Sequence, residues 1–171
     1  MELLIIRHAA AEGFATDDAS RVLTSKGRDQ SCRVGEFLKL NDLVPDVTLT
    51  SPYARACETA EVFCQSSGAD KPVIEPWLGC GMRPEKAMLE LTAYGDFGRV
   101  AICGHNPDFT YLCEWLLGNH KIFGYGNEAD RGIPIDGQSP WVMLFDNAMP
   151  LQNGTKANED FADVGFVIRS F

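Results

Sequence analysis

Three segments of this chain carry residue types suited to one kind of chemistry. Arg7-His8 directly follows a run of four apolar residues, Arg55 lies just after a Ser-Pro pair, and His105 follows a second apolar run. A neutral imidazole is a nucleophile, and an arginine guanidinium binds phosphate oxygens through two parallel N–H donors. Gathered in one place, these side chains would be suited to binding and transferring a phosphoryl group.

The apolar pattern places these residues at the ends of predicted elements. Strands are expected at residues 3–6, 47–50, 73–74 and 99–103, and helices at 24–39, 52–65, 85–94 and 107–117. This alternation predicts an α/β fold, a three-layer sandwich in which a mostly parallel sheet has helices on both faces. Ligands of such sheets bind at the carboxyl ends of the strands. Arg7-His8, Arg55 and His105 would therefore meet at one edge.

Local signals mark where three of the helices begin. Thr24, Ser51 and Asn106 are predicted N-caps, and Pro52 and Pro107 are predicted at first helical positions. A helix N-terminus offers free N–H groups and a partial positive charge. The two helices that follow strand ends should therefore favour an anion at the same edge.

The last third of the chain is less regular. Residues 119–140 are rich in glycine and proline and are expected to form a long excursion of unassigned role. Trp141–Phe145 and Val164–Ile168 are expected to add two late strands to the sheet, and His120 is expected at the surface. A length of 171 residues fits a single domain over residues 1–171.

Composition narrows the partners and the location. The 24 acidic and 15 basic residues give a formal charge of −9, which argues against broad nucleic-acid binding because that needs a basic surface. A few arginines in one pocket can still bind a small anion. Neither a signal-peptide core nor an apolar run of ~20 residues is found, and the six cysteines show no CxxC pair or zinc spacing. We expect a cytoplasmic protein with neither nucleic-acid nor membrane partners.

Four motifs resemble the histidine phosphatases related to phosphoglycerate mutases, and among them the small SixA-like phosphohistidine phosphatases. In chain order the motifs are Leu4-Ile5-Ile6-Arg7-His8-Ala9, Arg21-Val22-Leu23-Thr24-x-x-Gly27, Leu49-Thr50-Ser51-Pro52-x-x-Arg55-Ala56-x-x-Thr59-Ala60 and Cys103-Gly104-His105-Asn106-Pro107-Asp108. The likeness covers roughly residues 1–118, with the family's order and spacing.

This resemblance implies an enzyme that hydrolyses phosphoric monoesters or phosphoramidates without a metal ion or a cofactor. His8 would be the nucleophile and would be phosphorylated transiently. Arg7 and Arg55 would bind the phosphoryl oxygens, Arg21 would add a further contact, and a protonated His105 would donate to a phosphoryl oxygen. Phosphoryl transfer requires in-line attack and stabilisation of charge on the equatorial oxygens. His8 must be neutral to attack, so one of its ring nitrogens should donate to a carbonyl or carboxylate.

Two positions depart from the family pattern. Ala9 stands where the family usually has glycine, which is damaging if the φ angle there must be positive. The larger mutase-like relatives carry a glutamate after the third strand that protonates the leaving group. Here that stretch is Leu78-Gly79-Cys80-Gly81, without an acid. The general acid is therefore unassigned, with Asp18 and Glu75 as the candidates.

The missing acid bears on the substrate. An alkoxide leaving group needs a proton donor, whereas the imidazole of a phosphohistidine, with a pKa near ~6.5, leaves more easily. We expect the enzyme to dephosphorylate phosphohistidine on a signalling (phosphotransfer) protein. The alternatives are a phosphatase of small phosphorylated molecules and a non-catalytic phosphoprotein-binding module on the same scaffold. A metal hydrolase is disfavoured, because His8 and His105 are grouped with arginines rather than with other metal ligands.

Overall fold

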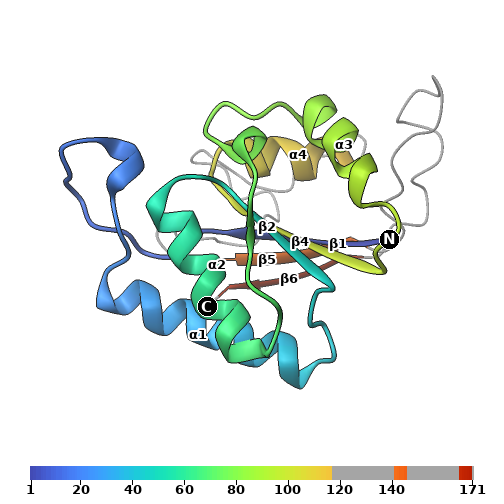
Figure 1. Cartoon of the computed structure of the whole chain (residues 1–171), viewed down its shortest axis with the longest axis horizontal. Helices are drawn as coiled ribbons and strands as arrows, with labels where there is room; N and C mark the ends of the chain where they lie inside the picture. Colours follow the sequence, from blue (N-terminus) through green and yellow to red (C-terminus); the bar gives the residue numbers. More distant parts are fainter. Residues whose placement is uncertain (117–140, 146–165, 171) are drawn as a thin grey trace, which may run out of the picture.

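The structure, a computed structural model, describes residues 1–116, 141–145 and 166–170. Over these residues the chain forms one sheet with helices on both of its faces (Figure 1). The expected α/β three-layer sandwich is confirmed. The assignment of residues 1–171 to one domain stays a prediction.

Four parallel strands form the centre of the sheet. They are β1 (Glu2–Arg7), β2 (Val47–Thr50), β3 (Val73–Ile74) and β4 (Arg99–Gly104), at the positions that the apolar pattern predicts. The order across the sheet is β3-β2-β4-β1-β5-β6. The register sets Arg7 beside Gly104 and Thr50 beside Cys103. The carboxyl ends of β1, β2 and β4 therefore lie at one level.

Two antiparallel strands complete the described sheet. β5 (Trp141–Phe145) pairs with β1, and β6 (Phe166–Ser170) pairs with β5. The strand predicted at Trp141–Phe145 is confirmed, whereas the one predicted at Val164–Ile168 is displaced by two residues. Apolar content did not reveal this register, because it depends on pairing between strands. The predictions for residues 119–140, including His120, lie outside the described residues.

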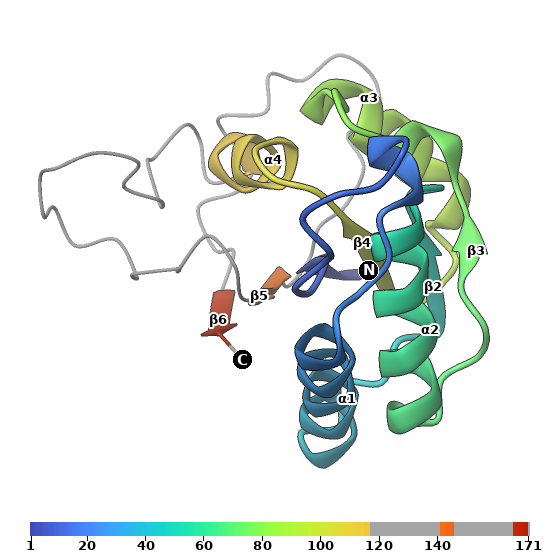
Figure 2. The same ribbon diagram turned by 90° about the vertical axis from the view of Figure 1, so that its left-hand side faces the viewer.

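The first face of the sheet is covered by α1 (Ser25–Leu40) and α2 (Ala54–Ser67), which lie side by side (Figure 1, Figure 2). Side chains alternate along a strand, and Leu4 and Ile6 of β1 point to these helices. They form an apolar cluster with Val34, Leu38, Ala56, Ala60, Phe63, Cys64, Ala101 and Cys103.

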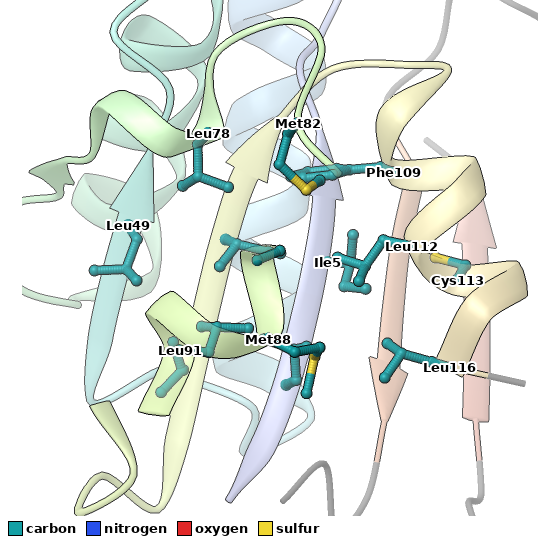
Figure 3. Packing of buried hydrophobic residues seen from close by; sticks show 14 of the residues in the cluster. Ile5, Leu49, Leu78, Met82, Met88, Leu91, Phe109, Leu112, Cys113 and Leu116 are labelled. Atoms are coloured by element: carbon teal, nitrogen blue, oxygen red, sulfur yellow. The ribbon is translucent and has the colours of Figure 1, made fainter. Parts of the chain in front are cut away.

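The second face is covered by α3 (Pro84–Leu91) and α4 (Asp108–Leu116), and its packing is drawn in Figure 3. Leu3 and Ile5, the other alternating pair of β1, point to this side. Their cluster includes Leu49, Leu78, Met82, Met88, Leu91, Val100, Ile102, Phe109, Leu112, Cys113 and Leu116. Because both faces are covered, the strands read as unbroken apolar runs rather than as alternating ones.

The predicted helix starts are only partly correct. Thr24 caps α1, and its hydroxyl accepts from the backbone N–H of Gly27 at 3.0 Å. The predictions that Ser51 caps a helix and that Pro52 begins it are wrong, since α2 begins at Ala54. The N–H of Ser51 donates to the carbonyl of Cys103 at 2.9 Å, which continues the pairing with β4 beyond the end of β2. Ser51 is therefore hydrogen-bonded to the sheet, and the helix begins three residues later.

The remaining helices differ from prediction by small amounts. The predictions that Asn106 caps a helix and that Pro107 begins it are wrong, since α4 begins one residue later, at Asp108. The helix predicted at 85–94 is α3 followed by the 3-10 helix η3 (Thr92–Tyr94). Within the described residues, none of the helices has the length and the apolar character needed to cross a membrane.

Candidate active site

Backbone hydrogen bonds bring three strand ends together. The N–H of His8 donates to the carbonyl of Gly104 at 3.0 Å, and Ser51 is bonded to Cys103 as described above. The segments after β1, β2 and β4 are thereby held against each other. The structure places Arg7, His8, Arg55 and His105 at this one edge, where the sequence predicts that they meet.

The imidazole of His8 is held in one orientation. Its Nδ1 lies 2.8 Å from the carbonyl oxygen of Ala9. A carbonyl only accepts, so Nδ1 carries the proton and Nε2 has the free lone pair. The Nε of Arg55 donates to that Nε2 at 3.3 Å. The donor to a backbone carbonyl that the sequence analysis required of the nucleophile is therefore present.

The electrostatic surroundings keep His8 neutral. Burial is the main cause that lowers its pKa, to about 4, and the charges of Arg7, Arg55 and Arg21 lower it further. The hydrogen bond to Ala9 acts in the opposite direction without cancelling them. A neutral, correctly protonated imidazole is consequently available at physiological pH.

The replacement of the family's glycine by Ala9 is harmless to the backbone. Among the described residues other than glycine, only Asp42 has a positive φ angle, so Ala9 has none. Its N–H donates to Oγ1 of Thr59 at 3.0 Å, and that hydroxyl donates to the carbonyl of Arg55 at 2.7 Å. Thr59 therefore ties the segment of His8 to the first turn of α2. The methyl group is accommodated there, since Ala9 is 1% exposed.

Arg55 is buried and almost fully engaged. Its Nη1 donates to the carbonyl of Asp18 at 2.8 Å, and its Nη2 lies 3.1 Å from the Asp18 carboxylate and 3.7 Å from Sγ of Cys80. The guanidinium also lies over the ring of Tyr53, with 4.9 Å between its carbon and the ring centroid. It thus extends from His8 to the exposed side of the pocket.

His105 lies on the other side of His8. Its ring centroid is 5.3 Å from that of His8 and 4.9 Å from that of Tyr53, and its Nε2 is 2.8 Å from Oγ of Ser51. Burial is the largest cause that lowers its pKa, to about 3, followed by the neighbouring charges of His8 and Arg55. The family resemblance implies a protonated His105, whereas the ring in this structure is neutral, because it is 2% exposed and lies beside cations.

Arg21 and Arg7 act on the pocket through their charge. Arg21 lies in the loop before α1, where its Nε donates to the Asp18 carboxylate at 2.8 Å and its Nη1 to the carbonyl of Glu12 at 3.0 Å. Its charge lowers the pKa of both histidines, although Arg21 contacts neither of them in the hydrogen bonds described. Arg7 is the last residue of β1 and lowers the pKa of His8.

Neither candidate general acid is arranged as a proton donor. The hydrogen bond from Arg21 is the main cause that lowers the pKa of Asp18, and the charge of Arg55 lowers it as well. Asp18 is therefore ionised at neutral pH. Glu75 accepts a hydrogen bond from the hydroxyl of Tyr94 at 2.6 Å and raises the pKa of that phenol to about 12. Both carboxylates are acceptors in this structure.

Four pocket residues escaped the sequence reasoning. Ser51 is predicted only as a helix cap and Thr59 only as part of a motif, and neither Tyr53 nor Cys80 is predicted to lie in the pocket. Ser51 and Thr59 belong to the same motif as Arg55, which is the signal that could have found them, whereas Cys80 lies outside that motif. The described residues contain no group of three or more His, Cys, Asp or Glu that could hold a metal ion.

Comparison with known proteins defines the class. The sequence profile of the histidine phosphatase superfamily (branch 1) matches residues 3–79. The chain belongs to this superfamily and is accordingly a phosphatase, a hydrolase acting on phosphorylated substrates.

Two relatives and one solved structure are similar to this chain. An uncharacterized protein of Picosynechococcus sp. is 31% identical over 119 residues, which cover 67% of this chain and 70% of that protein. The phosphohistidine phosphatase SixA of Escherichia coli strain K12 is 26% identical over 150 residues, covering 84% of this chain and 93% of SixA. The solved structure of the protein histidine phosphatase SixA complexed with tungstate has the same fold, with a TM-score of 0.69 at 22% identity over 85% and 88% of the two chains.

Proposed function

We propose that this phosphatase removes the phosphoryl group from a phosphohistidine on a signalling protein, through a transient phosphohistidine on His8. One observation carries the proposal: His8 presents a neutral Nε2 whose lone pair faces Arg55, while Nδ1 is held by Ala9. A module that only bound phosphate would have no need of this orientation of its imidazole.

In the first step, Nε2 of His8 attacks phosphorus in line with the leaving nitrogen. The new P–N bond uses the Nε2 lone pair, and the electrons of the old P–N bond return to the substrate imidazole. That imidazole takes a proton from water on its second nitrogen, so it leaves neutral. Arg7 and Arg55 bind the equatorial oxygens, with Arg21 contributing charge, and His105 donates to one of them.

In the second step, water attacks the phosphoryl group on His8. The electrons of the P–N bond return to Nε2, water loses a proton to solvent, and inorganic phosphate leaves. The Nδ1–H of His8 stays bonded to the carbonyl of Ala9 through both steps. No step calls for a metal ion, because the arginines stabilise the charge on the transferring group.

The state of the two acid candidates supports this substrate class. Asp18 is held ionised by arginines, and Glu75 accepts from Tyr94. With neither placed as a donor, a leaving group that departs without enzymatic protonation is favoured, and imidazole is such a group. The relative SixA is named a phosphohistidine phosphatase, which agrees with this choice. The free thiols of the described residues suit the reducing cytoplasm as the location.

The test compares three substrates side by side. A phosphohistidine protein, a sugar phosphate and an aryl phosphate are offered to the same enzyme preparation, with and without a chelator. We expect the highest kcat/KM on the phosphohistidine protein and no effect of the chelator. A sugar phosphate turned over best would establish the small-molecule phosphatase instead, and phosphate binding without any turnover would establish the binding module.

A further inference from the structure

Ser51 and His105 form a buried polar pair, of which the phosphatase reaction above uses His105 and gives Ser51 no role. Ser51 is 0% exposed and His105 is 2% exposed, and 2.8 Å separates Oγ of the serine from Nε2 of the imidazole. Oγ also accepts from the backbone N–H of Tyr53 at 3.3 Å. Because Ser51 does not cap α2, another reason is required for a hydroxyl at this position.

The hydrogen-bond inventory of the pair distinguishes the two tautomers of His105. If the ring proton were on Nε2, Oγ of Ser51 would accept twice, and its own buried O–H would have no acceptor among the residues that the structure describes. The Nδ1 acceptor would also be unpaired, since it has no hydrogen-bond partner among the residues described. If the proton is on Nδ1, the O–H of Ser51 donates to Nε2. Of the two groups, only the Nδ1–H donor of His105 is then without a partner among the residues described.

The charge state of His105 makes this choice meaningful. The ring is neutral, because burial, His8 and Arg55 lower its pKa, with Arg21 acting in the same direction and the Asp18 carboxylate opposing them. The other group packed against it, Tyr53, is also neutral, since its pKa is raised. A neutral imidazole has one proton, and only the tautomer decides which nitrogen can donate.

We propose that Ser51 is a positioning residue that holds His105 as the Nδ1–H tautomer, so that this N–H can donate to the phosphoryl oxygen. The inference deepens the proposed function and rests on its assignment of His105 as a donor to the phosphoryl group. Ser51 touches neither substrate nor phosphorus. It acts through His105, by filling the Nε2 lone pair and by fixing the angle of the ring.

This arrangement removes the need for a cationic histidine. The surroundings of His105 make its protonated form costly before substrate is bound. With the proton already on Nδ1, the neutral ring can donate to an incoming phosphate without first binding a proton from solvent. The hydroxyl of Ser51 can remain bonded to Nε2 in either protonation state of the ring, because a hydroxyl both donates and accepts.

The tautomer itself is the first readout. Imidazole 15N chemical shifts of the resting wild-type enzyme, with His105 assigned from the signals lost in His105→Gln, report which ring nitrogen is protonated. We expect a protonated Nδ1 and an unprotonated Nε2. A protonated Nε2 in the wild type overturns the proposal, whatever the enzyme's substrate proves to be.

Variants of Ser51 provide the second readout. Ser51→Ala should move the 15N shifts towards a tautomer mixture and lower kcat/KM on an aryl phosphate about tenfold, the scale expected for a misplaced donor. Ser51→Thr, which keeps the hydroxyl, should restore both. Ser67→Ala is the matched control, because Ser67 is also buried, accepts from the N–H two residues on and donates to one acceptor, Cys64.

The outcomes separate this proposal from the one on which it rests. If Ser51→Ala keeps the Nδ1–H tautomer and full activity, Ser51 is not a positioning residue. If the tautomer and the Ser51 variants behave as expected but phosphohistidine is a poor substrate, only the proposed substrate fails. Should Ser51→Ala not fold, the wild-type 15N shifts alone still confirm or overturn the tautomer.

Discussion

The Nε of Arg55 donates to Nε2 of His8 across 3.3 Å, although 47 residues separate them in the chain. This bond occupies the lone pair that would attack phosphorus. An incoming phosphoryl group must therefore draw the guanidinium away from the nucleophile and onto its own oxygens. The same arginine would hold the nucleophile before binding and the transferring group after it.

The first prediction concerns the covalent step. His8→Ala should abolish turnover, because no other group described in the pocket is oriented as a nucleophile. His105→Ala should lower the rate by about two to three orders of magnitude, as removal of a donor to a developing charge does, while phosphate still binds. Brief mixing with labelled substrate and denaturation in base should trap an acid-labile phosphoryl group on His8 in the wild type and in His105→Ala. A label found elsewhere would contradict the assignment.

The second prediction concerns pH and stability. The pKa of His8 is about 4 and that of His105 about 3 in the folded protein, against a usual value near 6.5. Below pH 6.5 the unfolded chain binds protons that the folded one does not, so the free energy of unfolding falls as the pH falls. The slope is about 1.4 kcal/mol per pH unit for each such histidine.

This slope is measured by urea unfolding between pH 7 and pH 5, above the range in which most carboxylates titrate. His105→Gln should show a flatter dependence than the wild type. Over the same pH range, protonation of His8 should not lower kcat/KM, because the pKa of His8 is about 4. Equal slopes in the wild type and the variant would show that His105 is protonated in the folded state.

The third prediction concerns the general acid. Asp18 is ionised and bonded to Arg21 and Arg55, so it competes with phosphate for these arginines rather than protonating a leaving group. Asp18→Asn should tighten the inhibition by phosphate several-fold. In Asp18→Asn, kcat/KM should depend on the pKa of the leaving group as steeply as in the wild type. Glu75→Gln should leave this dependence equally steep.

A series of aryl and alkyl phosphates measures this dependence. Without a placed proton donor, aryl esters should be turned over faster than alkyl esters by several orders of magnitude, each factor of ten being about 1.4 kcal/mol of barrier. A flat dependence that steepens in Asp18→Asn or in Glu75→Gln would identify the donor. The preference for phosphohistidine would then lose its physical support.

The fourth prediction concerns the attachment of the loop before α1. A Cβ at Gly27 would lie 2.1 Å from the carbonyl oxygen of Ala10, which already accepts from the N–H and hydroxyl of Thr24. Gly27→Ala should lower the free energy of unfolding by about 1–3 kcal/mol, the usual cost of overpacking. Gly13→Ala is the control, because nothing lies within 4 Å of its added Cβ. Equal stability of the two variants in urea unfolding would refute the close approach.

The sequence predicted the sheet and the residues at its edge with few errors. Leu3–Ile6 and the other apolar runs are long enough and bounded sharply enough to be strands, and Thr24 is bonded as its type and place predict. The edge followed from a general property of parallel sheets. The predicted helix start after Ser51 is wrong, because the backbone of Ser51 pairs with Cys103, a strand residue 52 positions further along the chain.

By itself, the sequence determined the strands of the parallel sheet, the edge at which Arg7, His8, Arg55 and His105 meet, and the class of chemistry that those residue types support. Local periodicity and motif spacing carry this information, because they depend on residues close together in the chain. Only the tertiary structure decided the protonation and the hydrogen bonds: a neutral His105, an ionised Asp18, and a serine bonded to an imidazole rather than to a helix. Burial and neighbouring charges set these states, and both arise from segments that are brought together only by folding.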